Sequence, residues 1–184
     1  MDEALDKAVR VFCERGYHAT SVGDLTSAME LASGSVYKAF KDKRAVFLSA
    51  FDRYKAVRDQ KLRTATGTTG NGRERIQKAL TFYVKASQGA EGRQGCLVVG
   101  SATELAIDDA EVARRVAAAL DRNEAFMADL IRQGQADGSI PRHIDPDDTA
   151  RLMVCLTQGM RVVGKTGRRL HAARLVDVAM KMLT

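Results

Sequence analysis

The chain has 184 residues, of which 45% are hydrophobic and 28% are charged, and its formal net charge is +6. This composition predicts an ordinary soluble globular protein of one or two domains, and the positive charge is compatible with a nucleic-acid partner without proving one. We expect neither a secretory signal, because the first residues are acidic, nor a membrane span, because no apolar run approaches the roughly 20 residues required. The three cysteines lie far apart without metal-binding spacing, so we expect reduced thiols, a cytoplasmic location, and no metal or other cofactor.

The first predicted helix covers residues 2–15. Its apolar side chains recur at helical spacing from Leu5 through Ala8 to Phe12, and Gly16 follows as a stop signal. A second, shorter helix is expected to begin after Ser21, which together with Asp24 matches a capping box.

The segment 21–43 is predicted to form two short helices joined by a tight turn at residues 29–32. The second of these helices, with Ser33 as its N-cap, can bury Val36 and Phe40. Small or polar residues then face outward: Ser33, Gly34, Ser35, Tyr37 and Lys38. This arrangement is what a helix-turn-helix needs to enter a major groove, and we expect these residues to contact base edges or phosphates.

A basic cluster follows the second short helix. Residues 38–44 hold four basic residues and one acidic residue, although residues 1–44 as a whole are neutral. Such a cluster beside a recognition helix is placed to hold phosphates; Lys38 is expected there from its charge and position, and Ser21 is a further expected phosphate contact.

The rest of the chain is predicted to be helical, with no internal repeat and no strand-like alternation. Helices are expected at about 42–63, 73–88, 96–107, 109–136, 146–165 and 171–183, with polar loops at 64–72 and 89–95. The helix that begins at Asp42 is too long for the N-terminal domain alone and is a candidate transmitter between domains.

Several of these positions resemble the N-terminal domain of the TetR family of bacterial transcriptional regulators. The resemblance rests on Ala8, Phe12, Gly16, Thr20-Ser21-Val22 and the run from Gly34 to Lys43. It covers roughly the first fifty residues, and it implies that Tyr37 contacts DNA from the recognition helix and that Lys43 holds a phosphate. One departure is Glu30, which stands where the family usually has glycine and would be strained if that position needs a positive φ.

The resemblance implies an all-α protein with about nine helices. A helix-turn-helix domain is expected at residues 1–46, followed by a ligand-binding and dimerisation domain at residues 47–184. The implied function is a DNA-binding transcriptional repressor that a small molecule releases from its operator. The partners would be operator DNA, a second copy of the chain, and an effector of unknown identity.

The last two helices are expected to form the homodimer interface, the alternative being that they are internal core. The expected interface residues are Met153, Met160, Val163, Leu175, Ala179 and Met182. A ligand pocket is implied among the middle helices, and ordinary core is the alternative for each of its candidates. These candidates are Tyr83, Cys96, Val99, Phe126, Met127, Leu130, Leu152, Cys155 and Leu156. Glu104 is expected either to contact a polar ligand group or, as the blander alternative, to lie on a solvated face.

Other functions fit these patterns less well. An enzyme is disfavoured because the three histidines lie near predicted helix ends without an acid or cysteine at motif spacing. A nucleotide site at 67–72 is disfavoured because that glycine-rich loop follows a helix and lacks a Gly-Lys-Ser/Thr ending. A regulator that senses oxidants or electrophiles through Cys96, near Arg93, and a helical module that no longer binds DNA remain open alternatives.

Overall fold

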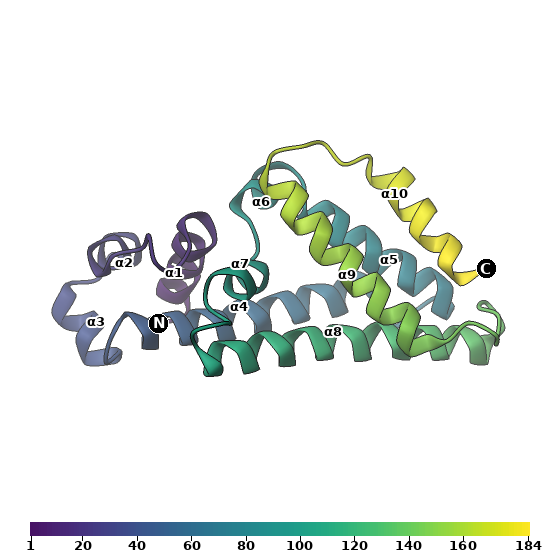
Figure 1. Cartoon of the computed structure of the whole chain (residues 1–184), viewed down its shortest axis with the longest axis horizontal. Coiled ribbons are helices and arrows are strands. Elements are labelled where there is room, and N and C mark those ends of the chain that lie inside the picture. The colour runs from purple at the N-terminus through teal and green to yellow at the C-terminus, as the bar shows by residue number, and fades with distance from the viewer. The chain divides into compact units, whose positions relative to one another are not determined.

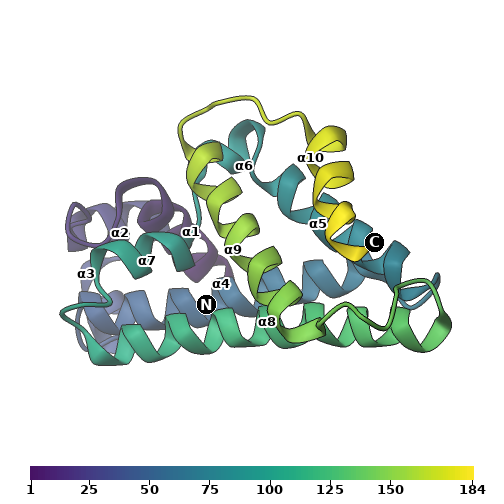
Figure 2. The same ribbon diagram turned by 45° about the vertical axis from the view of Figure 1, so that its right-hand side comes forward.

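The computed structural model describes the backbone of residues 1–184 and all side chains except those of Ser33 and Tyr37. The regular structure of the described backbone is all helical, with turns and loops between the helices and no strand, which confirms the all-α prediction (Figures 1 and 2). The elements are α1 (Asp2–Arg15), α2 (Val22–Met29), α3 (Ser33–Ala39), α4 (Lys43–Thr66), α5 (Gly72–Ala86), α6 (Gly89–Gln94), α7 (Leu97–Glu104), α8 (Ala110–Asp137), α9 (Pro146–Lys165), α10 (Ala172–Ala179) and the 3₁₀ helix η1 (Met180–Leu183).

The helix boundaries follow local capping signals. Asn71 forms a capping box with Glu74 at the start of α5, and the Asp145 side chain accepts two backbone N–H bonds at the start of α9. The predicted loop at 89–95 is wrong: residues Gly89–Gln94 form the short helix α6, which begins at Gly89 with φ 59° and is followed by Gly95 with φ 98°. Among the helices that the structure describes, we find none with the length and apolarity to cross a membrane.

Contacts divide the chain into two compact units. The first unit consists of Met1–Asp59 and Gln94–Val116, and the second of Gln60–Arg93 and Ala117–Thr184. This division differs from the expected boundary at 46/47, because α7 and the start of α8 group with the N-terminal helices. Helices α4 and α8 each contribute residues to both units.

An aromatic cluster forms much of the core of the first unit. The rings of Phe12 in α1 and Phe47 in α4 meet edge to face with centroids 5.2 Å apart, and Tyr17 lies edge-on to Phe47 at 5.1 Å. Phe12 and Phe47 are each 2% exposed. Burial and aromatic geometry both stabilise this contact between α1 and the start of α4, and α1 in turn packs against α2, which contacts α3.

The second unit has a larger aliphatic core. Helix α5 packs against both α9 and α10, and their ribbons lie side by side in both views (Figures 1 and 2). The side chains that are fully covered in this core include Ile76, Leu80, Met127, Ile131 and Met153. Gly164 in α9 permits a close approach, because a Cβ there would lie 2.1 Å from the carbonyl oxygen of Ser87.

Candidate nucleic-acid interface

Helix α2 begins with the predicted capping box. The Ser21 hydroxyl accepts the backbone N–H of Asp24 at 3.0 Å and donates to the Asp24 carboxylate at 2.7 Å. Hydrogen bonds from Ser21 are the main cause of a lowered pKa of the Asp24 carboxyl. Because the one hydroxyl proton of Ser21 is already engaged, holding a phosphate would require this bond to break.

The turn between α2 and α3 places Glu30 at a positive φ, the strained case that the sequence raises. Glu30 adopts φ 55° and ψ 37°, in the left-handed region, and its carboxylate lies 2.9 Å from the Lys7 ammonium. The chain therefore places a charged, Cβ-bearing residue at a position that glycine occupies without steric penalty.

Helix α3 presents a small, polar surface at its start. Gly34, Ser35 and Lys38 are exposed, while Val36 is 3% exposed and anchors the helix inward, as predicted. Ala32, one residue earlier than predicted, is the N-cap. The Ser33 and Tyr37 side chains lie outside the part of the chain that the structure describes.

Only part of the basic cluster at 38–44 is free to contact phosphate. The Lys43 ammonium donates to the carbonyl oxygens of Tyr17 and Thr20, each at 3.0 Å, and lies 4.2 Å from the centroid of the Tyr17 ring. Arg44 is engaged by two carboxylates, whereas Lys38 and Lys41 are exposed and form no ion pair within the described side chains. Lys43 therefore fixes the segment that precedes α2, and Lys38 and Lys41 are the cations open to phosphate.

A charge network joins α4 to the start of α8 within the first unit. The Arg44 guanidinium donates to Asp109 at 2.7 and 2.9 Å and to Glu111 at 2.9 Å, and Arg115 bridges Glu111 and Asp52. Arg44 holds the pKa of the Asp109 carboxyl well below its usual range, and Arg44 and then Arg115 lower the pKa of Glu111. Asp109 also accepts the N–H groups of Glu111 and Val112 as the N-cap of α8.

The sequence did not anticipate the role of Glu104. Its carboxylate, at the end of α7, accepts the backbone N–H of Tyr17 at 2.9 Å and that of His18 at 2.7 Å. Gly16 has φ 82°, and a Cβ there would lie 2.6 Å from Glu104 Oε2. Glu104 thus holds the loop between α1 and α2, and neither of its expected roles matches this contact.

The predicted pocket residues separate into three groups. Tyr83, Met127 and Leu130 are buried in the core of the second unit, with Phe126 and Leu156 packed against it. Leu152 and Cys155 are exposed, because they lie on the face of α9 opposite the buried Met153, Thr157 and Met160, which corrects the prediction that they line a pocket. Cys96 and Val99 belong to the first unit.

The predicted dimer residues also need correction. Met153, Met160 and Ala179 are at most 5% exposed within a single chain, so they have almost no surface to offer a partner. Leu175 and Met182 are partly buried against the same core, and Val163 is partly buried. The exposed large apolar residues of α9 and α10 are instead Leu152, Val162 and Val178.

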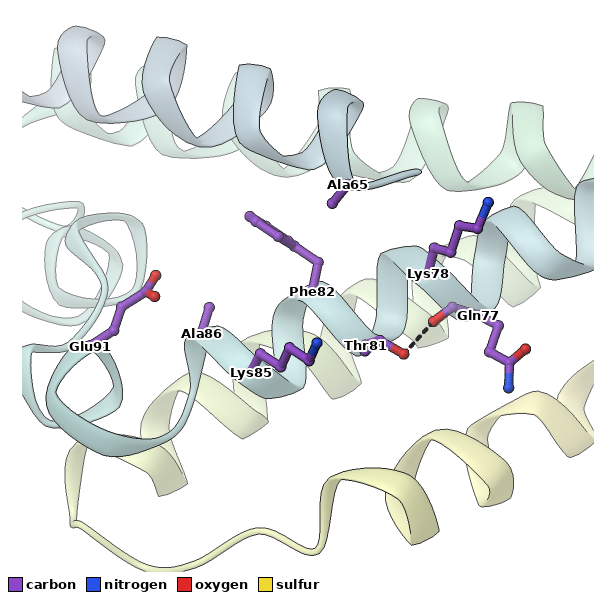
Figure 3. Close-up of a pocket in the computed structure, with 8 residues that line it drawn as sticks. All are labelled: Ala65, Gln77, Lys78, Thr81, Phe82, Lys85, Ala86 and Glu91. Carbon is purple, nitrogen blue, oxygen red and sulfur yellow. Dashed lines mark hydrogen bonds between the residues drawn. The ribbon is translucent and has the colours of Figure 1, made fainter. Parts of the chain in front are cut away.

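A recess of about 390 Å³ opens beside α5 in the second unit (Figure 3). Its lining consists of Ala65, Gln77, Lys78, Thr81, Phe82, Lys85, Ala86 and Glu91. The Phe82 side chain leaves α5 on the side that faces the helix carrying Ala65, and the Lys78 and Lys85 side chains stand on the same helix as Phe82 (Figure 3). Sequence reasoning missed this recess, because its apolar residues are few and lie between charged ones.

Cys96 is the N-cap of α7 and is half-buried. The Tyr54 hydroxyl donates to its Sγ at 3.3 Å, a contact within the first unit. Among the side chains that the structure describes, no group of His, Cys, Asp and Glu could hold a metal ion.

A capped helix, a tight turn and a second helix with an exposed polar start define the helix-turn-helix class of DNA-binding proteins. Residues 4–50 match the family model described as bacterial regulatory proteins, tetR family, and residues 72–179 match a tetracyclin repressor-like C-terminal domain. The chain belongs to the TetR family; it is a DNA-binding regulator of transcription and not an enzyme.

Similar proteins agree with this assignment. The transcriptional repressor ComR of Escherichia coli is 28% identical over 97% of this chain and 84% of ComR. The uncharacterized regulator YezE of Bacillus subtilis is 32% identical over 73% of this chain and 71% of YezE. A cysteine mutant of the TetR-family regulator CifR, solved with a 26-base-pair operator DNA, is 28% identical, covers 100% of this chain and 94% of its own, and has a TM-score of 0.84.

Proposed function

We propose that the chain is a homodimeric, cytoplasmic repressor that binds operator DNA through α3 and is released by a small molecule. The observation that carries the proposal is the exposed start of α3, where Gly34, Ser35 and Lys38 follow a capped α2 and a tight turn. Small side chains allow the backbone to approach base edges, and Lys38 adds a phosphate contact. The repressor names of ComR, DhaR and KstR2 support the sign of regulation.

A second copy of the chain is proposed to pair through α9 and α10. Leu152, Val162 and Val178 are 57%, 52% and 62% exposed, so these two helices leave apolar surface uncovered in the single chain. A two-fold dimer would present two copies of α3 to two half-sites, which raises affinity beyond that of one helix-turn-helix.

The proposed effector site is the recess beside α5. Its volume of about 390 Å³ falls within the usual range of roughly 300–1,000 Å³ for ligand pockets. Phe82, Ala65 and Ala86 supply apolar surface, and Lys78 and Lys85 supply positive charge. Because α4 contributes Ala65 to this recess and is continuous with the first unit, a ligand that favours one position of α4 would shift the population of DNA-binding conformers.

The test of DNA binding is fluorescence anisotropy with the DNA upstream of the protein's own gene and a scrambled fragment of equal length. We expect tight binding to the first fragment and at least tenfold weaker binding by Ser35→Glu, which places a negative charge on the exposed start of α3. Ala102→Glu adds the same charge at an exposed position of α7 and should bind like the wild type. Equal affinity of the wild type for both fragments would count against a specific operator there.

Thiol sensing by Cys96 is a second candidate, supported by the hydrogen bond from Tyr54. The Tyr54 hydroxyl lies 3.3 Å from Sγ, and Cys96 is half-buried rather than fully covered, which leaves part of this residue open to an oxidant. Peroxide treatment should then weaken DNA binding by the wild type but not by Cys96→Ser. Unaltered DNA affinity of the oxidised wild type would remove this candidate.

A further inference from the structure

A second recess in the second unit is lined by arginines. It has a volume of about 220 Å³ and lies where the end of α9 and the loop after it meet the segment around Gln88 and Gly89. Its charged lining residues are Arg93, Arg168 and Arg169, and none of its lining residues in the described part of the chain is acidic. It shares no lining residue with the recess beside α5.

Within the described side chains, the three guanidinium groups are not paired with protein carboxylates. Other arginines of the chain, such as Arg44, Arg53 and Arg115, lie within ion-pair distance of an aspartate or a glutamate. The described side chains offer no such ion pair to Arg93, Arg168 or Arg169. Because each guanidinium group is a cation, a recess lined by three of them and by no carboxylate favours an anion.

Close backbone packing fixes the segments that line this recess. A Cβ on Gly164 would meet the carbonyl oxygen of Ser87 at 2.1 Å, and a Cβ on Gly92 would meet it at 2.5 Å. The Gln88 side chain donates to the carbonyl oxygen of Leu170 at 3.0 Å, which ties the loop after α9 to the same segment. In Figures 1 and 2 this loop leaves α9 beside α6. The backbone that carries the arginines is therefore fixed before any ligand arrives.

We propose that this recess binds the phosphoryl or pyrophosphoryl group of a small molecule. The planar fork of a guanidinium matches two phosphate oxygens, and three such groups suit an anion with more than one charge. A recess of about 220 Å³ encloses such a group and is too small to take a nucleic-acid duplex. The site goes beyond the proposed DNA-binding function and does not depend on it.

Calorimetric titration of the full chain with sodium pyrophosphate, and separately with inorganic phosphate, tests the proposal. Sodium chloride at matched ionic strength serves as the salt control. We expect saturable binding of pyrophosphate, and at least tenfold weaker binding by Arg168→Gln and by Arg169→Gln. Arg93→Lys keeps the charge but loses the fork, so it should weaken binding less than Arg93→Gln. Arg142→Gln, which removes an exposed arginine outside the recess, should bind like the wild type.

Two results would overturn the proposal. One is a heat signal that chloride reproduces, or that all the arginine variants retain. The other is loss of binding to duplex DNA or to phosphatidate vesicles in Arg168→Gln and Arg169→Gln while pyrophosphate binding is unchanged or absent, which would assign the arginines to a macromolecular surface. Circular dichroism of each variant confirms that the exposed substitutions leave the helices intact.

Discussion

Glu30 adopts a backbone conformation that favours glycine. In the left-handed region a Cβ costs roughly 1–2 kcal/mol, because it crowds the following carbonyl oxygen. The ion pair of Glu30 with Lys7 offsets little of this cost, because the Glu30 side chain is 76% exposed. The backbone conformation of Glu30 should therefore lower the free energy of unfolding by more than its ion pair with Lys7 raises it.

We predict that Glu30→Gly raises the free energy of unfolding by about 0.5–1 kcal/mol, because it removes the steric penalty. Urea unfolding followed by circular dichroism measures the change. Glu30→Ala is the matched control: it removes the carboxylate, keeps the Cβ, and should give no gain. Equal stabilisation by both substitutions would show that the carboxylate, and not the Cβ, destabilises the turn.

Helix α7 is connected to the loop between α1 and α2 by the Glu104 carboxylate. Each of its two oxygens accepts one backbone N–H, from Tyr17 and from His18. In Glu104→Gln one of these N–H groups would face an amide NH₂, so we predict a loss of about 1 kcal/mol in the free energy of unfolding of the first unit. Hydrogen exchange of the Tyr17 and His18 amides should accelerate. Exchange at the wild-type rate would show that Glu104 does not hold this loop in solution.

Helix α4 is connected to α8 by Arg44 and Asp109, and this contact gives a pH-dependent contribution to stability. The pKa of Asp109 is lower in the folded chain than in the unfolded one, chiefly because of the hydrogen bond from Arg44. Ionised Asp109 therefore stabilises the folded state above its unfolded pKa of about 3.9, and the contribution is lost as the pH falls toward the lower folded pKa.

We predict that Asp109→Asn is less stable than the wild type at pH 7 and that the difference shrinks as the pH falls from 4 to 2. The variant loses the α8 cap and a charged hydrogen bond, so its free energy of unfolding should be lower by about 1–2 kcal/mol at pH 7. Denaturant unfolding at pH 7, 4, 3 and 2 measures the difference. A difference that does not change with pH would argue against the paired carboxylate.

At the scale of the whole molecule, the proposed function requires two subunits. Leu152→Glu and Val162→Glu place charges in the exposed apolar face of α9, so we predict that they convert a dimer to monomers in sedimentation-velocity experiments. Ile107→Glu introduces the same charge at a residue that is 95% exposed in the first unit and should leave the dimer intact. Dimers that persist in both α9 variants would place the interface elsewhere.

The helices and the helix-turn-helix could be predicted from the sequence because caps, glycines and apolar spacing act locally. The capping box of Ser21 and the Pro146 start of α9 are examples. The partners of long polar side chains could not be predicted, because they depend on residues distant in the chain: Arg44 meets Asp109, and Glu104 meets Tyr17. The faces of α9 were predicted poorly because both of them carry apolar residues, so periodicity alone does not separate core from surface.

The most direct test of DNA recognition through α3 is the salt dependence of binding to the DNA upstream of the protein's own gene. For the wild type we expect the logarithm of the affinity to fall steeply and linearly with the logarithm of salt concentration, at two subunits or a multiple per site. In Lys38→Gln the slope should be less steep by roughly 0.9 for each phosphate that the variant no longer binds, so by about twice that for a dimer. A wild type that binds no promoter fragment even at low salt, or a slope that Lys38→Gln leaves unchanged, would contradict DNA recognition through α3.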